Sequence, residues 1–142
     1  MHFFRKHTNN IIIVSNVFKV KEYNLNNSNI NNYIKYIEKY LIDFGYIKTM
    51  SASIYDNAHC LSLGFKKFLT TDYDIISMFS LLMMMDEGID GHCFFVFDEL
   101  GFIAYPHDDT GFGFIRIKNT EVHYDDIFLK NIAQFSDFTS VW

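Results

Sequence analysis

The chain has 142 residues, of which 49% are hydrophobic and 18% aromatic, and its formal net charge is −5. It is long and apolar enough to bury one continuous core, which excludes a disordered tail and a small disulfide-dependent protein. Residues 1–70 carry nine Lys or Arg and four Asp or Glu, whereas residues 71–142 carry three and thirteen. Because an acidic surface repels phosphate backbones and attracts basic proteins, this asymmetry argues against nucleic-acid binding by the second half.

No segment has the pattern of a membrane span or a secretory signal. The longest apolar run, residues 75–85, has 11 residues, whereas a membrane-spanning helix needs about 20. The basic start of the chain is followed by only a short apolar run, so we expect no signal peptide and a cytoplasmic protein. Cys60 and Cys93 make no disulfide framework, and both are expected to stay reduced.

The first third of the chain predicts extended structure followed by a helix. Residues 2–24 are rich in β-branched and aromatic residues and predict two extended pieces separated around residues 8–10, with a strand or hairpin at a sheet edge. Apolar residues then recur every three or four positions, which predicts an amphipathic helix that begins after Ser28 or Asn29 and ends at Gly45. Its apolar positions are Ile30, Tyr33, Ile34, Ile37, Leu41 and Phe44.

The middle of the chain predicts two short strands and a second helix. Weak alternation favours strands at about residues 48–55 and 59–65. Thr71 and Asp74 then form a capping-box pattern with Asp in place of Glu, and apolar residues follow at helical spacing. This mostly buried helix should end near Gly88.

The last third predicts a three-stranded meander and a closing helix. Two apolar, aromatic runs within residues 92–106 flank a connection at residues 98–101, in which Gly101 can take a positive φ, and this is the pattern of a β-hairpin. Residues 110–118 add a third strand, and a helix should run from about residue 124 to 135. The apolar face of that helix would consist of Ile127, Phe128, Ile132 and Phe135.

This order of elements predicts the α+β class. We expect residues 1–142 to form a single domain in which about three helices pack on a central, mostly antiparallel sheet. Successive turns of a meander alternate between the two ends of the sheet. The segment that precedes the hairpin and the segment that follows Pro106 should therefore lie at the same end.

Two His-Cys dipeptides, at residues 59–60 and 92–93, could supply zinc ligands by residue type. Adjacent residues of a strand point to opposite faces, so neither dipeptide can easily give both side chains to one ion. Zinc sites also leave at least two residues between paired ligands. We therefore expect no metal and no cofactor, and we expect burial to raise the pKa of Cys93 and make its thiol unreactive.

Two similar tetrapeptides, PHDD at residues 106–109 and HYDD at residues 123–126, suggest a candidate catalytic site. Their candidate groups are His107, Asp108 and Asp109, and His123, Asp125 and Asp126. They could form a metal-dependent hydrolase if the fold brought the two segments together. No known catalytic motif accompanies them, and turn chemistry and the first turn of a helix explain the same acids. We expect a protein that is not an enzyme, with the hydrolase as an alternative.

The acids cluster at the connections of the predicted meander. Five of them would share one end of the sheet with an aromatic residue, a patch that could steer and bind a cationic protein. The predicted partner-binding residues are Asp86, Glu87, Asp90, Tyr105, His107, Asp108 and Asp109. Asp98 and Glu99 would lie at the other end. The alternative is a solvated acidic face that keeps an apolar-rich protein soluble.

The segment Tyr-Pro-His-Asp-Asp-Thr-Gly, residues 105–111, lies between two apolar strands and is followed by a closing helix in a short acidic chain. This arrangement resembles bacterial immunity proteins of contact-dependent growth inhibition and related polymorphic toxin systems, over about residues 94–117. The resemblance implies a non-catalytic inhibitor that binds a cognate toxin domain, often a nuclease, and covers its basic cleft. It implies neither nucleic acid nor a membrane as a partner. A structural, homo-oligomeric subunit with an interface of aromatic-rich strands is a further alternative.

Overall fold

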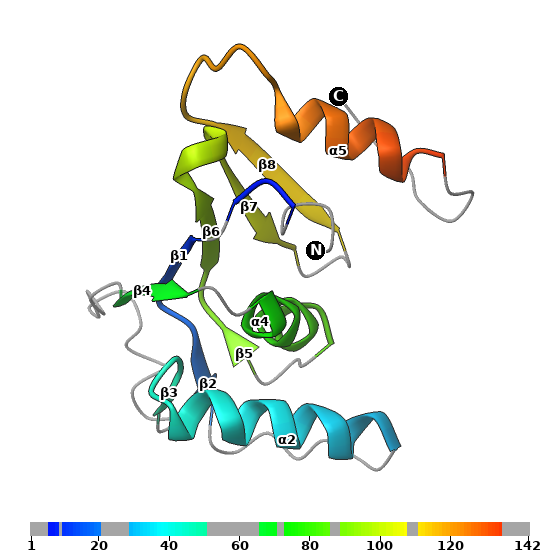
Figure 1. The fold of residues 1–142 in the computed structure, drawn as a ribbon. Coiled ribbons are helices and arrows are strands. Elements are labelled where there is room, and N and C mark those ends of the chain that lie inside the picture. The colour runs from blue at the N-terminus through cyan, green and yellow to red at the C-terminus, as the bar shows by residue number, and fades with distance from the viewer. Residues whose placement is uncertain are drawn as a thin grey trace.

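Within the described residues of the computed structural model, strands and helices are intermixed along the sequence, and three helices pack around two sheets (Figure 1). The structure describes residues 6–8, 10–20, 29–50, 66–70, 73–85, 89–107 and 111–134. The helices are α2 (Asn29–Asp43), α4 (Tyr73–Met85) and α5 (Tyr124–Ile132). None of the helices in these ranges is long and apolar enough to cross a membrane.

The strands form one large and one small sheet. The large sheet is built from β1 (Ile11–Ser15), β4 (Lys66–Thr70), β6 (Cys93–Phe97), β7 (Phe102–Pro106) and β8 (Phe112–Arg116). Its order is β4-β1-β6-β7-β8, and every neighbouring pair is antiparallel. The small sheet contains β2 (Phe18–Val20), β3 (Lys48–Met50) and β5 (Ile89–Asp90), in the order β3-β2-β5. The predicted α+β class, with a mostly antiparallel central sheet, is confirmed.

The predicted meander is present as β6, β7 and β8. A short 3-10 helix, η2 (Asp98–Leu100), joins β6 to β7, and Gly101 closes it with φ +78°. The N–H of Gly101 donates to the carbonyl of Phe97 at 2.9 Å. Because β6 and β7 are antiparallel, the start of β6 and the end of β7 meet at one end of the sheet, and η2 lies at the other.

The prediction for the start of the chain needs two corrections. Residues 6–8 and 10 lie outside any strand, as the predicted break requires, and residues 2–5 lie outside the described residues, but the second extended piece is itself divided into β1 and β2 at Asn16 and Val17. In addition, β1 is an interior strand between β4 and β6. Ile11 and Ile13 of β1 are buried, whereas Ile12 and Val14 on its other face are partly exposed. The small sheet adds a parallel pair, β2 with β3, because α2 carries the chain back to the same end.

Helix α2 has nearly the predicted bounds, and Gly45 follows it with φ +74°. The core stripe is narrower than predicted: Ile34, Ile37 and Leu41 are buried, but Tyr33 and Phe44 are 58% and 63% exposed. The aromatic residues stand on the solvent side because α2 contacts the rest of the molecule, chiefly α4, along a single stripe.

The remaining elements agree with the predictions in part. Of the strand predicted at residues 48–55, only β3 is described. The strand predicted at residues 59–65 lies outside the described residues, as do Thr71 and Phe135, while β4 follows at residues 66–70. The predicted apolar face of α5 is wrong at Ile127, which is 39% exposed. Tyr124 and Phe128 pack against the core instead.

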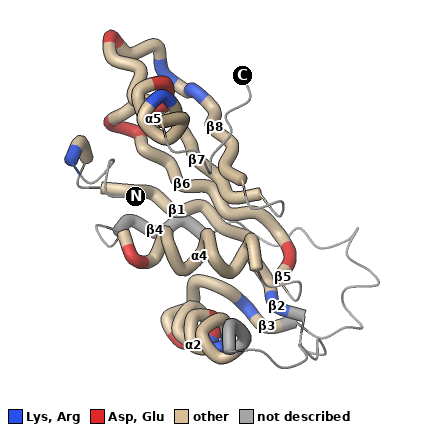
Figure 2. Tube along the Cα trace, turned by 90° about the vertical axis from the view of Figure 1, so that its right-hand side faces the viewer, with Lys and Arg blue, Asp and Glu red and all other residues tan. Residues whose placement is uncertain are grey.

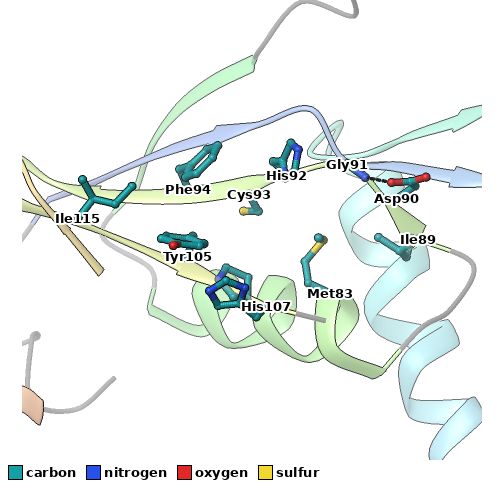
Figure 3. Close-up of a pocket in the computed structure, with 11 residues that line it drawn as sticks. Met83, Ile89, Asp90, Gly91, His92, Cys93, Phe94, Tyr105, His107 and Ile115 are labelled. Atoms are coloured by element: carbon teal, nitrogen blue, oxygen red, sulfur yellow. Dashed lines mark hydrogen bonds between the residues drawn. The ribbon is translucent and has the colours of Figure 1, made fainter. Parts of the chain in front are cut away.

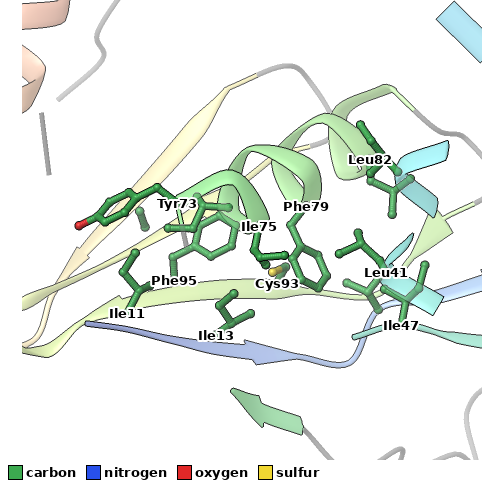
Figure 4. Close-up of a cluster of buried hydrophobic side chains, with 14 of the residues drawn as sticks. Ile11, Ile13, Leu41, Ile47, Tyr73, Ile75, Phe79, Leu82, Cys93 and Phe95 are labelled. Carbon is green, nitrogen blue, oxygen red and sulfur yellow. The ribbon is translucent and has the colours of Figure 1, made fainter. Parts of the chain in front are cut away.

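One face of the large sheet carries the core, and α4 covers it (Figure 4). Ile13, Phe95, Ala104 and Phe114 stand opposite one another on adjacent strands and therefore share this face. The ring of Phe95 lies 6.5 Å from that of Phe79 on α4. The ring of Phe114 lies 5.6 Å from that of Phe128, so α5 packs on the same face.

The opposite face of the large sheet is also apolar. Ile12, Val96, Ile103 and Ile115 stand opposite one another across β1, β6, β7 and β8. The first three are partly exposed and Ile115 is 45% exposed, and none of the four belongs to the buried core. We call this row the open face.

Candidate functional site

A pocket of about 540 Å³ lies at the end of the large sheet where β6 begins and β7 ends (Figure 3). Its lining residues are Met83, Ile89, Asp90, Gly91, His92, Cys93, Phe94, Tyr105, Pro106, His107 and Ile115. Three of them, Asp90, Tyr105 and His107, are predicted partner-binding residues, and the structure brings them together as the meander argument expects. The other predicted residues, Asp86, Glu87, Asp108 and Asp109, lie outside the described residues.

A tight turn at Gly91 positions one wall of the pocket. Gly91 has φ +106°, a conformation that favours glycine. Asn16 fastens this turn from the connection between β1 and β2: its N–H donates to the carbonyl of His92 at 3.1 Å, and its side-chain Oδ1 accepts the N–H of His92 at 2.6 Å. The carboxylate of Asp90 accepts the N–H of Gly91 at 2.6 Å. Asn16 therefore fixes the segment that carries Asp90 and His92.

Four rings form a continuous row along the pocket, which we call the aromatic row. The centroid distances are 6.1 Å from His92 to Phe94, 5.8 Å from Phe94 to Tyr105 and 4.7 Å from Tyr105 to His107. The ring of Tyr105 lies directly over Gly113, because a Cβ at Gly113 would stand 2.2 Å from Cζ of Tyr105. Gly113 thus makes room for Tyr105, a role that the sequence interpretation did not assign to it.

The two ends of the connection between β7 and β8 lie side by side at the end of the sheet. The backbone N–H of His107 donates to the carbonyl of Gly111 at 2.9 Å, which joins the two residues on either side of positions 108–110. Pro106 stands opposite Phe112 at the start of β8. The described part of the predicted Tyr-Pro-His-Asp-Asp-Thr-Gly turn therefore closes the end of the sheet beside the pocket.

Among the described residues that line the pocket, Asp90 is the one carboxylate, and none is Lys or Arg. The nearest cation by strand pairing is Lys19, which stands opposite Ile89 on β2. Its ammonium donates to the carboxylate of Glu38 on α2, and both side chains are largely buried. Lys19 is thus directed toward α2, and the charge at the pocket wall comes from Asp90.

The second acidic segment lies far from the pocket. Arg116 donates to Oδ2 of Asp125 from Nη2 at 2.8 Å and from Nε at 3.1 Å, and to Oδ1 of Asp126 at 2.9 Å. This hydrogen bonding to Asp125 raises the pKa of Arg116. Figure 2 shows a basic position at the end of β8 beside α5, at the far end of the strand from β5.

Arg116 stands opposite Phe102, whereas Phe112 stands opposite Pro106. The two strand positions are separated by about 13 Å at the usual rise per residue. Among the described residues of the hydrolase alternative, His107 and the Asp125–Asp126 pair therefore lie at opposite ends of β8, while Asp108 and Asp109 lie outside the described residues. The sequence interpretation assigned both acids to the helix dipole and missed their partner, although Arg116 is one of only three cations in residues 71–142.

The acids of the hairpin turn lie at the end of the sheet opposite to the pocket, as predicted, and each of them has a partner there. The carboxylate of Asp98 pairs with the ammonium of Lys118 at 2.7 Å. The carboxylate of Glu99 accepts the hydroxyl of Thr8 at 2.6 Å, and Thr8 is buried. These contacts fasten the start of the chain and the segment after β8 to η2, which is a structural role.

Cys93 lies at the base of the pocket region and is buried. Burial raises the pKa of its thiol, and a hydrogen bond with Ser15 opposes the shift only in part. The predicted direction of this shift is confirmed. Within the described residues, no group of three or more His, Cys, Asp and Glu side chains is arranged to hold a metal ion. His59 and Cys60 lie outside those residues.

Stability should fall at alkaline pH because of Cys93. The thiol stays neutral in the fold, but in the unfolded chain it ionises above about pH 8.5. The contribution of the buried, neutral thiol to the free energy of unfolding is therefore fully present below that pH. Above it, the free energy of unfolding falls by about 1.4 kcal/mol per pH unit. Urea unfolding of wild type and Cys93→Ala between about pH 8 and 10.5 measures this effect, since other groups titrate in both proteins. Parallel pH profiles would contradict the prediction.

Comparison of this chain with protein-family models, curated proteins and solved structures finds no match.

Proposed function

We propose that this protein is a non-catalytic immunity protein that binds a cognate, basic toxin domain and neutralises it. The binding surface is the sheet end that holds Asp90, Tyr105 and His107, together with the acids at positions 86, 87, 108 and 109. The observation that carries the proposal is the convergence of the three described residues, from two separate segments, on one pocket.

The surroundings of the pocket support a protein partner. Phe94, Tyr105 and Ile115 line the pocket and also lie on the side of the sheet that includes the open face. A contiguous apolar surface bordered by charges is typical of a protein interface, with an apolar centre and a polar rim. The acids of the proposed surface would accelerate association with a basic partner.

The direct test is to express the toxin domain encoded by the adjacent gene with this protein and purify one of them by a tag. We expect a stable one-to-one complex, because neutralisation without catalysis requires tight binding. Absence of binding to any neighbouring gene product would contradict the proposal. A tagged, unrelated acidic protein of similar size controls for non-specific charge attraction.

Charge reversal at Asp108 and Asp109 should slow association with the toxin domain. We expect Asp108→Lys with Asp109→Lys to lower the association rate about tenfold at low salt, because the variant repels a basic partner. Thermal stability should change far less. Stopped-flow or surface-binding kinetics at several salt concentrations measure the rate.

A matched control is Asp98→Lys with Glu121→Lys, which makes the same change in net charge at the opposite end of the sheet. Both side chains are exposed. Because salt screens charges beyond about 8–10 Å, this variant should retain most of the wild-type rate. Equal slowing by both variants would show that net charge alone acts, and an unchanged rate for Asp108→Lys with Asp109→Lys would remove those residues from the interface.

The open face favours a second candidate, a structural homo-oligomer. Its row of four aliphatic side chains, partly exposed on the large sheet, could pack against the same row of a second copy. Sedimentation velocity distinguishes the two candidates. An apolar homo-oligomer persists at high salt, whereas the immunity protein should bind its toxin domain in a salt-dependent way.

A further inference from the structure

We propose that the pocket receives an arginine side chain of the partner, with the guanidinium stacked against Tyr105 and Phe94 and paired with Asp90. This inference rests on the proposed function, because it identifies the anchor residue of the same partner. It goes beyond attraction between charged surfaces, since it assigns one side chain of defined chemistry to one cavity.

The aromatic row supplies the surface for stacking. A cation within about 6 Å of an aromatic ring centroid is attracted to the ring face, and Arg does so more often than Lys. Tyr105 lies 5.8 Å from Phe94 and 4.7 Å from His107, so the rings form one wall rather than isolated contacts. Met83 and Ile89 border the pocket from α4 and β5 (Figure 3). They offer apolar contact to the methylene groups of an arginine.

The charge of the pocket selects a cation. Asp90 is the carboxylate among the described lining residues, and no Lys or Arg is among them. Its Oδ1 accepts the N–H of Gly91. An ionised carboxylate has about four lone-pair positions, so one carboxylate can accept several donors at the same time. Arg–carboxylate pairs are among the strong, charge-assisted hydrogen bonds of proteins.

The pocket is large enough for an arginine side chain, and its walls are fixed by contacts within the protein. Its volume of about 540 Å³ falls within the range of roughly 300–1,000 Å³ that small ligands occupy. Tyr105 is held over Gly113, and Asn16 fixes the turn that carries Asp90. Both walls are therefore in place before a ligand arrives, which lowers the entropic cost of binding.

The experiment uses small probes and does not require the toxin. The whole protein is titrated with N-acetyl-arginine amide, and the shifts of aromatic NMR signals are followed, with Tyr105 assigned from the Tyr105→Phe spectrum. N-acetyl-citrulline amide, which has nearly the same shape without the charge, is the matched control. We expect saturable shifts of the Tyr105 signals with the arginine probe and about tenfold weaker binding of the citrulline probe.

Variants link the binding to the pocket. Asp90→Asn should weaken arginine-probe binding at least threefold, and Gly113→Ala should do the same by displacing the Tyr105 ring without removing it. Tyr36→Leu, on the exposed side of α2, is the control and should bind as wild type does. The amide spectrum of each variant verifies that it is folded, and Asp90→Asn alone suffices if Gly113→Ala unfolds.

The inference is overturned if the arginine probe gives no saturable shift up to about 50 mM, if citrulline binds equally well, or if neither pocket variant weakens binding. These results are independent of the proposed function. Toxin binding without probe binding would reject the arginine pocket alone, and probe binding without any toxin partner would reject the immunity function alone.

Discussion

Replacing Phe95 with Ala should lower the free energy of unfolding by about 3–5 kcal/mol. Phe95 is fully buried on β6, and its ring packs against that of Phe79 on α4. It also stands opposite Ile13 on β1 and Ala104 on β7, at the centre of the large sheet. Truncation leaves a cavity between the sheet and α4 that neither element can close without moving the other, so the full transfer and cavity costs apply.

Urea unfolding followed by circular dichroism measures the effect. The urea midpoint should fall while the slope of free energy against urea stays constant, since the native fold is retained. Phe112→Ala is the matched control, because Phe112 lies on the edge strand and is 36% exposed. We expect it to cost less than about 1 kcal/mol. Equal costs for the two variants would show that the sheet and α4 do not enclose Phe95 as described.

Replacing Gly91 with Ala should cost about 2–4 kcal/mol of stability. The position has φ +106°, which L-residues rarely adopt, and an added Cβ would lie 2.6 Å from the backbone carbonyl oxygen of Asn16. That oxygen belongs to the backbone between β1 and β2, so it cannot move aside without shifting two strands. The substitution also disturbs the turn that positions Asp90 at the pocket.

Gly101→Ala provides the comparison, because Gly101 also has a positive φ. A Cβ there would meet a methyl group of the Thr120 side chain at 2.9 Å, and a side chain can rotate away. We therefore expect Gly101→Ala to lower the melting temperature less than Gly91→Ala does. The opposite order would mean that Asn16 does not hold the Gly91 turn closed.

The C-terminal half of the fold follows from local patterns that agree with one another. Residues 92–106 contain two apolar runs and a glycine placed for positive φ, and the structure forms the β6–β7 hairpin with Gly101 in that conformation. Once β8 is added, antiparallel geometry alone requires that Asp90 and His107 share one end of the sheet. The same reasoning predicted that Asp90, Tyr105 and His107, which line the pocket, lie near one another.

Other features depend on contacts that local patterns do not encode. An apolar run such as residues 11–14 fits an edge strand or an interior strand equally well, and its place next to β4 is decided by a strand about 50 residues later. The pairing of Arg116 with Asp125 likewise depends on how α5 returns to β8. Local sequence patterns could therefore predict neither the place of β1 in the sheet nor the ion pair of Arg116 with Asp125.

The place of the candidate site in the fold was predicted from the sequence, but the contacts that form the site were not. No role for Asn16 was predicted from the sequence, yet Asn16 holds the turn at His92 through two hydrogen bonds. No packing role for Gly113 was predicted either, yet its missing Cβ makes room for the ring of Tyr105. Both roles arise between segments that are distant in sequence. The one available signal was the occurrence of glycine within an apolar strand, which often marks a close approach.

The most direct test of the central claim is a titration of the toxin domain's activity with this protein. A non-catalytic inhibitor that binds the toxin tightly predicts activity that falls linearly and vanishes at one molecule of inhibitor per molecule of toxin. Complete inhibition by a small fraction of an equivalent would reveal an enzyme that inactivates the toxin. Full toxin activity in the presence of excess protein would contradict the immunity function itself.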